Sequence, residues 1–100
     1  MVTAIVLVTC EVDRTPETAQ ALADLDGVSE VYSVAGDWDL VAIVRVANHD
    51  DLATVVTERI RKVPGVAATS TLIAFRTYSR HDLEELFSVG FEAAGTGQPD

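Results

Sequence analysis

The chain repeats one pattern of elements twice, and this repeat limits the fold more than any other feature of the sequence. In each half, an apolar run is followed by a segment with helical periodicity, a Gly-Val turn and a second apolar run. The two turns are Leu25-Asp26-Gly27-Val28 and Val63-Pro64-Gly65-Val66. Two successive right-handed βαβ crossovers build a four-stranded antiparallel sheet with both helices on one face. We therefore expect an α+β protein with the ferredoxin-like βαββαβ architecture.

Composition and end signals bound these elements. Runs rich in β-branched residues favour strands, and the short connection from Gly36 to Asp39 forces the strands on either side of it to be antiparallel. The sequence predicts strands at Val2–Val12, Val28–Ala35 and Leu40–Val46 and within Val66–Tyr78, and helices from Thr15 to Leu25 and from Asn48 to Val63.

The helix ends have recognisable residues. Thr15 is a candidate N-cap with Pro16 after it, and Asn48 is a second candidate cap. The inward stripe of the first helix is expected to be thin, and the second helix has a longer one. The predicted stripes are Ala19, Leu22 and Ala23, then Leu52, Val55, Val56, Ile60 and Val63.

A chain of 100 residues is the size of one domain. We expect residues 1–80 to form it. Leu83, Leu86 and Phe87 predict a short helix over 81–91. Residues 92–100 lack periodicity and contain Gly, Pro and polar residues, which predicts a disordered tail.

The sheet face without helices is expected to be apolar, because the strands carry large apolar residues at both odd and even positions. If that face met water, each large side chain would forgo about 1.5–3 kcal/mol of burial. The sequence therefore predicts a homodimer whose sheets pack face to face, as in dimeric α/β barrels. The expected interface residues are Ile5, Leu7, Val41, Ile43, Ile73 and Phe75.

Charge limits the possible partners. With 16 acidic and 7 basic residues, the formal net charge is −9, which disfavours direct binding to nucleic acid or an anionic membrane. No apolar run approaches the roughly 20 residues that span a bilayer, and the start lacks the pattern of a signal peptide. We therefore expect a cytoplasmic protein. Cys10 lies in an apolar run and is expected to be a buried thiol.

The turn Gly36-Asp37-Trp38-Asp39 is the main candidate site. On spacing alone a purely structural turn is the simpler interpretation, with Gly at positive φ and Asp bonding the backbone. A functional interpretation is that the carboxylates bind the ammonium of an amino acid, while backbone N–H groups bind its carboxylate. The adjacent hydroxyls of Thr69, Ser70 and Thr71 are further candidate ligand-binding groups, although β-branched threonines also simply favour strands.

No catalytic or metal-binding constellation can be assembled from the sequence. His49 and His81 lie at helix starts and lack companions at ligand spacing, and there is no phosphate-binding Gly-rich loop. We expect no cofactor and no enzyme activity. A small monooxygenase of the dimeric α/β-barrel type stays open as an alternative, because fold alone does not decide function.

Three motifs together resemble the ligand-binding domain of the Lrp/AsnC regulators, called the RAM domain. They are Leu25-x-Gly27-Val28-x-x-Val31, Gly36-Asp37-Trp38-Asp39-Leu40-Val41 and Val63-Pro64-Gly65-Val66-x-x-Thr69-x-Thr71. The resemblance implies dimers that pack through their sheets and often assemble into octamers. It also implies amino-acid effectors bound between dimers, near Gly36–Asp39 and Thr69–Thr71.

The chain departs from that family in two places. Met1 leads straight into the first strand, where family regulators carry an N-terminal helix-turn-helix, so the chain resembles the stand-alone RAM proteins and DNA binding is not carried over. The tail after Tyr78 is also longer than the resemblance covers. The leading hypothesis is an amino-acid sensor that changes its assembly or joins full-length Lrp/AsnC regulators. A pure assembly module without a ligand is the alternative.

Overall fold

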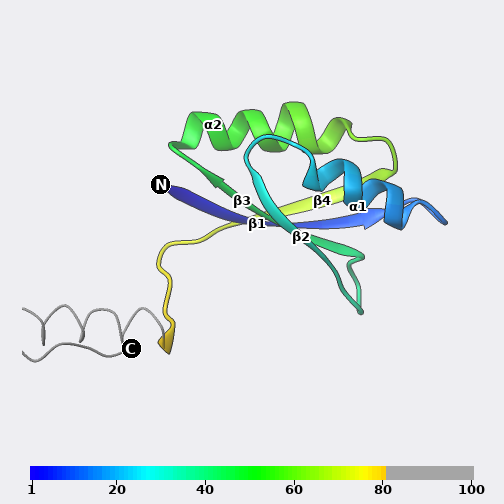
Figure 1. Ribbon diagram of the computed structural model, residues 1–100, viewed down its shortest axis with the longest axis horizontal. Coiled ribbons are helices and arrows are strands. Elements are labelled where there is room, and N and C mark those ends of the chain that lie inside the picture. Colours follow the sequence, from blue (N-terminus) through cyan, green and yellow to red (C-terminus); the bar gives the residue numbers. More distant parts are fainter. Residues whose placement is uncertain (81–100) are drawn as a thin grey trace, which may run out of the picture.

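The structure is a computed structural model that describes residues 1–80, so the predicted helix over 81–91 and tail over 92–100 lie outside the described residues. The strands and helices of the described residues follow the predicted order βαββαβ (Figure 1). Its elements are β1 (Val2–Cys10), α1 (Thr15–Ala23), β2 (Val28–Ser33), β3 (Leu40–Val46), α2 (His49–Thr54), a π-helical turn η1 (Val55–Arg59), a 3₁₀ turn η2 (Ile60–Lys62) and β4 (Val66–Ile73).

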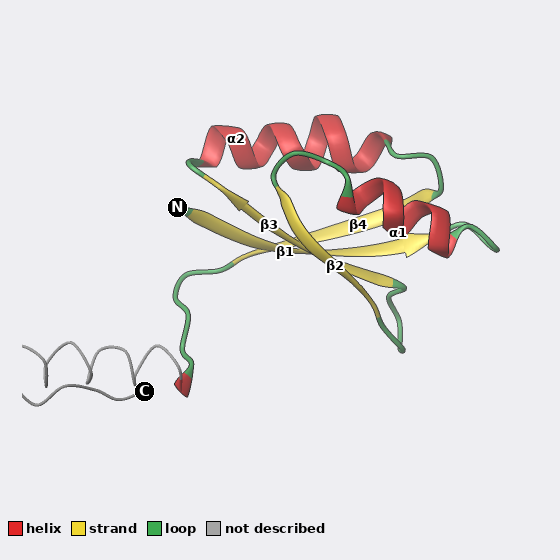
Figure 2. Ribbon diagram, in the orientation of Figure 1, coloured by secondary structure: helices red, strands yellow, loops and turns green. Residues whose placement is uncertain are grey.

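The four strands form one antiparallel sheet in the order β2-β3-β1-β4. Figure 2 shows α1 and α2 together on one side of this sheet. Both βαβ crossovers therefore place their helices on the same face, which confirms the predicted ferredoxin-like fold. The central strands β1 and β3 are the ones with the most continuous apolar sequences, because they are covered on both edges.

The strands end earlier than predicted. β1 stops at Cys10 and the chain then turns through Asp13, which has a φ of 65°. β4 stops at Ile73, which pairs with Ala4, whereas the apolar run continues toward Tyr78. The N–H of Ala74 donates to the carbonyl of Thr3, close to the first residue of β1. Because β1 has almost no residues before Thr3 that could pair with β4, the ladder of hydrogen bonds ends there. β2 and α1 are likewise two residues shorter at their C-terminal ends than predicted.

The two predicted helix caps have different outcomes. Asn48 caps α2 as predicted, since its Oδ1 accepts a hydrogen bond of 2.8 Å from the backbone N–H of Asp51. Thr15 does not cap α1, because it is already the first residue of the helix. The cap position is Arg14, whose side chain makes no capping hydrogen bond, and Pro16 stands inside the first turn.

The second helical segment is not one regular helix. It begins as α2, widens into the π-helical turn η1 and tightens into η2 before Val63. Val55 and Ile60 are both buried although they are five residues apart, a spacing that the wider turn accommodates. The structure therefore keeps the predicted inward residues and adds a turn with i→i+5 hydrogen bonding, a feature often found at functional sites.

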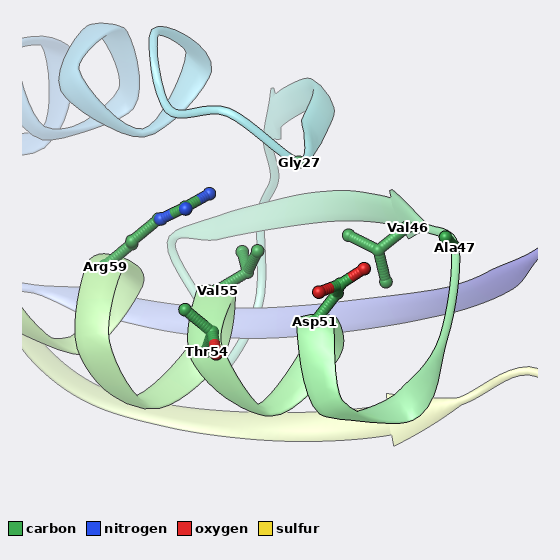
Figure 3. Close-up of a pocket in the computed structure, with 7 residues that line it drawn as sticks. All are labelled: Gly27, Val46, Ala47, Asp51, Thr54, Val55 and Arg59. Carbon is green, nitrogen blue, oxygen red and sulfur yellow. The ribbon is translucent and has the colours of Figure 1, made fainter.

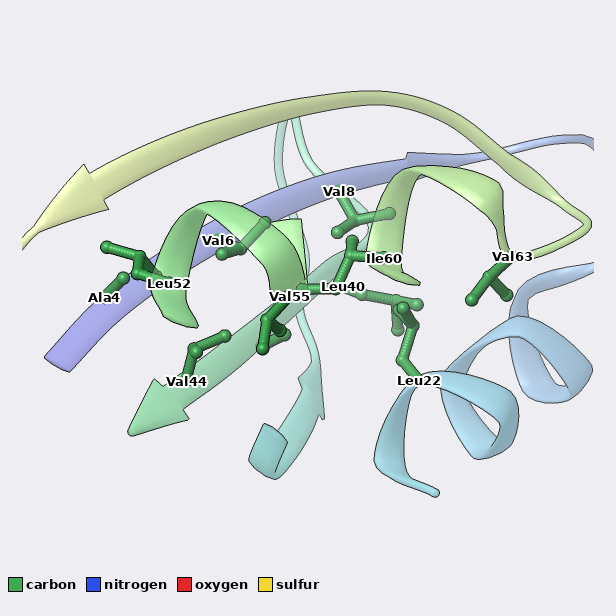
Figure 4. Packing of buried hydrophobic residues seen from close by; sticks show 11 residues of the cluster. Ala4, Val6, Val8, Leu22, Leu40, Val44, Leu52, Val55, Ile60 and Val63 are labelled. Atoms are coloured by element: carbon green, nitrogen blue, oxygen red, sulfur yellow. The ribbon is translucent and has the colours of Figure 1, made fainter. Parts of the chain in front are cut away.

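One hydrophobic core lies between the sheet and the helices (Figure 4). Three alternate residues of β1 face it, and β3 contributes three more, so each central strand points every second side chain toward the helices. Val56, the other residue of the predicted second stripe, is partly buried against this core. The buried hydrophobic residues are Ala4, Val6, Val8, Leu22, Leu40, Ala42, Val44, Leu52, Val55, Ile60 and Val63.

The inward stripe that the sequence predicts for α1 does not include a polar residue that the structure buries. Thr18 is fully buried, and its hydroxyl donates to the carbonyl of Pro64 at 3.3 Å. Gly65 makes this approach possible: its φ is +96°, and a Cβ there would lie 2.1 Å from Thr18 Oγ1. Ala23, which was predicted to face inward, is exposed.

The open face of the sheet, on the side away from the helices, is largely apolar. Strand pairing places Tyr32, Val41, Leu7 and Ser70 in one row across it, and the next row contains Ile43, Ile5 and Leu72. Ile5, Leu7, Val41 and Ile43 are half-buried in the single chain, and Leu72 is 51% exposed.

The predicted side-chain direction in β4 was wrong by one residue. Ile73 pairs with the buried Ala4, so it faces the helices, and Leu72 takes its place on the open face. Phe75 lies beyond the end of β4 and is 97% exposed, so it belongs to neither face of the sheet. The face-to-face homodimer itself stays a prediction.

Candidate functional site

The turn from Gly36 to Asp39 connects β2 to β3 at the end of the sheet where β1 finishes. Val34 donates its N–H to the Asp39 carbonyl at 3.0 Å, and Asp39 donates its own N–H to the Val8 carbonyl at 2.9 Å. The Asp39 carboxylate accepts a hydrogen bond of 2.7 Å from the backbone N–H of Cys10. Asp39 therefore anchors the turn to β1, which supports the structural interpretation for this residue.

Asp37 and Gly36 are exposed at the tip of the same turn, and Trp38 is half-buried. Gly36 has a φ of +120°, and a Cβ placed there would meet nothing within 4 Å. The Asp37 carboxylate makes no hydrogen bond or ion pair with the described residues. Of the two carboxylates in the turn, Asp37 is thus the one open to an added ligand.

The three candidate hydroxyls of β4 do not converge. Thr69 and Thr71 pair with the core residues Val8 and Val6, so they face the helices, whereas Ser70 pairs with Leu7 on the open face. The β4 residue next to the turn is Thr69, because Val8 lies between it and Leu40. With strands about 4.8 Å apart, Thr69 lies about 10 Å from the first residue of β3.

Thr69 borders a groove of about 510 Å³ beside the start of β4, together with Arg61. A guanidinium and a hydroxyl in one groove suit a carboxylate. Arg61 was not identified from the sequence, where a charged residue near a helix end resembles any solvent-exposed cation.

Cys10 lies between Asp39 and α1. Burial raises the pKa of its thiol, hydrogen bonding with the Thr15 hydroxyl lowers it, and the negative charge of Asp39 raises it again, so that the net change of the pKa is upward. The thiol is only partly buried, not fully buried as expected, and it packs against the hydrophobic core. A raised pKa disfavours the thiolate form that a nucleophile needs.

The open face carries one polar cluster that the sequence did not reveal. Arg45 and Glu30 form an ion pair of 3.1 Å across β3 and β2, and the Tyr32 hydroxyl donates to the same carboxylate. The hydrogen bond from Tyr32, followed by the hydrogen bond and charge of Arg45, lowers the pKa of the Glu30 carboxyl. The sequence signal was limited to the spacing of Glu30 and Tyr32, which are two residues apart on β2 and therefore point to the same face of the sheet.

A second pocket was not anticipated from the sequence. It has a volume of about 210 Å³ and lies on the helix side, between the turn at Gly27, the end of β3 and the second helical segment (Figure 3). Asp51, Thr54 and Arg59 provide its polar groups, and Val46 and Val55 provide apolar ones.

Residues 1–80 contain neither a metal-binding cluster nor a helix that could span a membrane. No group of three or more His, Cys, Asp or Glu side chains in this part of the chain is arranged to hold a metal ion. No helix among these residues is long and apolar enough to cross a membrane.

Known proteins resemble the chain over most of the described residues. The family model "Lrp/AsnC ligand binding domain" matches residues 3–83. The crystal structure of TTHA0845 from Thermus thermophilus is 46% identical, with a TM-score of 0.74, and the likeness covers 80% of this chain and 100% of that one.

Longer regulators match as well. An uncharacterized HTH-type transcriptional regulator of Pyrococcus furiosus, PF0250, is 41% identical over 61 residues, which are 61% of this chain and 41% of that protein. A feast or famine regulatory protein of M. tuberculosis, solved in complex with L-methionine, is 32% identical with a TM-score of 0.64, covering 80% of this chain and 54% of that one.

The chain thus spans less than half the length of the curated regulator it matches. The family match extends through the whole sheet, both helical segments and all three quoted motifs. The resemblance seen in the sequence is therefore confirmed: this chain belongs to the Lrp/AsnC family and has the fold of its ligand-binding domain.

Proposed function

We propose that this chain is an amino-acid-binding regulatory domain that does not contact DNA itself and acts by ligand-dependent assembly. The observation that carries the proposal is the juxtaposition of an apolar open sheet face with an exposed carboxylate, Asp37, in a turn at the end of the same sheet. Its relatives include transcriptional regulators and a protein complexed with L-methionine, which supports an amino acid as the effector.

Assembly through the open face follows from its composition. The centre of this face is a cluster of Ile5, Leu7, Val41 and Ile43, with Leu72 beside it. In the single chain, the exposed apolar surface of these side chains is in contact with water. Burying the exposed half of a side chain such as Leu72 contributes about 1 kcal/mol. Several such residues in each of two copies make an isologous dimer favourable.

Effector binding at the Asp37 turn follows from the assignment of the two carboxylates. Asp39 already accepts the N–H of Cys10, so Asp37 is the group that would receive an ammonium. The carboxylate of the same amino acid would bind Arg61 and Thr69 of a neighbouring protomer, since these two share a groove. Binding between protomers would couple the ligand to assembly by differential affinity for two states.

The absence of direct DNA contact is inferred from charge. A net charge of −9 opposes approach to a phosphate backbone. Regulation would then pass through a protein partner, either a second copy of this chain in a larger ring or a full-length regulator with a similar domain. Since relatives of this chain are transcriptional regulators, we place its action in the cytoplasm, where such regulators would meet DNA.

A thermal-shift scan against the twenty amino acids, with the oligomer mass followed in parallel, tests the proposal. A ligand at a hundredfold excess over Kd stabilises by about 2.7 kcal/mol, which raises the midpoint of a small domain by several degrees. We expect a selective shift that disappears in Asp37→Asn. The matched control is Asp13→Asn, an exposed aspartate in a different turn. A selective shift that survives Asp37→Asn would contradict the site.

A pure assembly module is the second candidate, and one observation favours it. The turn has a complete structural role through Asp39, which holds it against β1 without any ligand. A stable dimer or ring that shows no response to any amino acid would establish this second candidate.

A further inference from the structure

β4 forms one edge of the sheet, and its backbone groups alternate between two directions. The strand order β2-β3-β1-β4 gives it one neighbour, β1, among the described residues. The N–H of Ala74 donates to the carbonyl of Thr3 on β1, and successive residues of a strand direct their backbone groups to opposite sides. Even-numbered residues of β4 therefore bond to β1, whereas Thr69, Thr71 and Ile73 direct their N–H and C=O groups away from the sheet.

The composition of this edge favours pairing with another strand. Natural edge strands commonly carry charged residues, Pro or irregularities that hinder a second chain. β4 is eight residues long, and its sequence VAATSTLI has no charged residue and no Pro. The pairing irregularity opposite Thr9 and Cys10 affects only its first residues, so Ala68–Ile73 is a regular stretch. The other edge strand, β2, carries the Glu30 carboxylate, which forms an ion pair with Arg45.

A mostly apolar groove lies on the helix side of the same edge. Its volume is about 320 Å³, and the second helical segment and β4 form its walls. Ala53 and Val56 line it from the helical segment, and Thr71 and Ile73 line it from the strand. Ile73 is 47% exposed, and Leu72, which points to the open face, is 51% exposed. Apolar surface therefore borders the outward-directed backbone groups on both faces of the sheet.

The regular stretch of β4 is complementary to a second copy of itself. Residues directly opposite each other in an antiparallel pair point to the same face, so a two-fold axis between two identical strands must pass through a residue position. An axis at Thr71, the middle one of the three outward-directed residues, places Thr69 opposite the partner's Ile73. Each outward-directed residue then exchanges both backbone hydrogen bonds with its opposite residue. On the open face, Leu72 lies opposite the partner's Ser70, so a large side chain meets a small one.

We propose that β4 pairs antiparallel with β4 of a second copy of this chain, about a two-fold axis at Thr71, and joins the two sheets into one. Because α1 and α2 lie on one side of the sheet (Figure 2), the helices of both copies share one side of the joined sheet. The second copy covers the groove beside Ile73. The same register brings Phe75, which is 97% exposed, close to the partner's Ala67, whose side chain is small.

This contact goes beyond the proposed function, because it requires no ligand and its hydrogen bonds lie at the sheet edge and not on the open face. Charge is consistent with this location. With a net charge of −9, two copies repel each other overall, and an uncharged strand lets them meet without placing carboxylates opposite each other. A chain that also pairs through its open face would have two isologous contacts and would form assemblies larger than a dimer.

Amide hydrogen exchange followed by NMR tests the contact, because it reports on each backbone N–H separately. We expect the amides of Thr69, Thr71 and Ile73 to exchange at least tenfold more slowly at high protein concentration than at low concentration. Ser70 and Leu72 bond to β1 and should be protected at both concentrations. Packing through the open face alone would not slow the exchange of every second residue. Sedimentation over the same concentration range gives the mass of the assembly.

Thr71→Lys tests the position of the axis. It places two ammonium groups opposite each other and should weaken the edge contact at least tenfold. Thr71 is exposed, faces the helices and directs its backbone away from β1, so this variant keeps the fold and leaves the open face unchanged. The matched control is Ser33→Lys, which adds the same charge to an exposed position on the other edge strand and should leave the contact intact.

Cysteine cross-linking gives a positive readout of the same register. In a Cys10→Ala background, Thr71→Cys would bring two Cα atoms to about 5.5 Å, a distance that a disulfide spans. We expect oxidation to give a covalent dimer of Thr71→Cys and not of Ser33→Cys.

Three results would overturn the proposal. The first is fast exchange of the three outward-directed amides at concentrations where the chain is assembled. The second is unchanged self-association in Thr71→Lys. The third is a covalent dimer of Ser33→Cys in place of Thr71→Cys, which would assign the contact to β2. An open-face dimer or an amino-acid response that persists in any of these cases would leave the proposed function standing, so the two proposals fail separately.

Discussion

Replacing Gly65 with alanine tests how the helix and the sheet are joined. The backbone there has a φ of +96°, where an L-residue with a Cβ costs about 1–2 kcal/mol. The new Cβ would also lie 2.1 Å from Thr18 Oγ1, far inside contact distance. Moving Thr18 would break its hydrogen bond to Pro64 inside the core, which costs about 1–3 kcal/mol.

The sum is a loss of about 2–5 kcal/mol in the free energy of unfolding for Gly65→Ala. For a domain of this size, each kcal/mol lowers the melting temperature by about 4–8 °C. Gly36→Ala is the matched control, because Gly36 also has a positive φ, +120°, but nothing lies within 4 Å of the added Cβ. Denaturant unfolding followed by circular dichroism at fixed protein concentration gives both values. We expect Gly36→Ala to show the backbone cost alone.

A double-mutant cycle separates the clash from the backbone cost. In a Thr18→Ala background the obstructing Oγ1 is gone, so Gly65→Ala should cost only about 1–2 kcal/mol there. An equal loss in both backgrounds would refute the idea that contact with Thr18 requires glycine at position 65.

Three further predictions concern single side chains. Asn48→Ala removes the cap of α2 and should lower the free energy of unfolding by about 1 kcal/mol, measured by denaturant titration, with Asn48→Asp as the conservative control. Leu72→Lys should convert a dimer to a monomer in sedimentation experiments, because Leu72 lies on the open face. Ile73→Lys should leave the dimer intact, because Ile73 is similarly exposed but faces the helices. A dimer that is lost in Ile73→Lys and kept in Leu72→Lys would contradict the strand register. Because its folded-state pKa is lowered from the usual 4.5, Glu30 should contribute stability above its unfolded pKa and lose it as the pH falls through its folded pKa. This acid dependence should be smaller in Glu30→Gln, and an unchanged pH profile would contradict the role of the Tyr32 and Arg45 contacts.

The fold could be predicted because several local signals agree. β-branched runs, a Pro in the first turn of α1, the Asn48 cap and the two Gly-Val turns each act over a few residues, and their order permits few topologies. The family resemblance rests on the same turns. The site could be predicted only in part, because the sequence did not distinguish Asp37 from Asp39. The bond from Cys10 to Asp39 joins residues 29 apart, and nothing local encodes it.

The sequence by itself determined the number and order of the elements, the position of the candidate turn and the apolar character of both sheet faces. Tertiary structure alone decided which side of the sheet each β4 residue faces, because an irregularity between Thr9 and Cys10 shifts the pairing of β1 with β4. A strand that is apolar on both faces carries no alternation to reveal that choice. The π-helical turn and the pocket between Asp51 and Arg59 are likewise tertiary features. Both occur where the second helical segment lies beside the Gly27 turn and buries Val55 and Ile60 in the same core. This arrangement depends on packing between distant parts of the chain and not on local propensity.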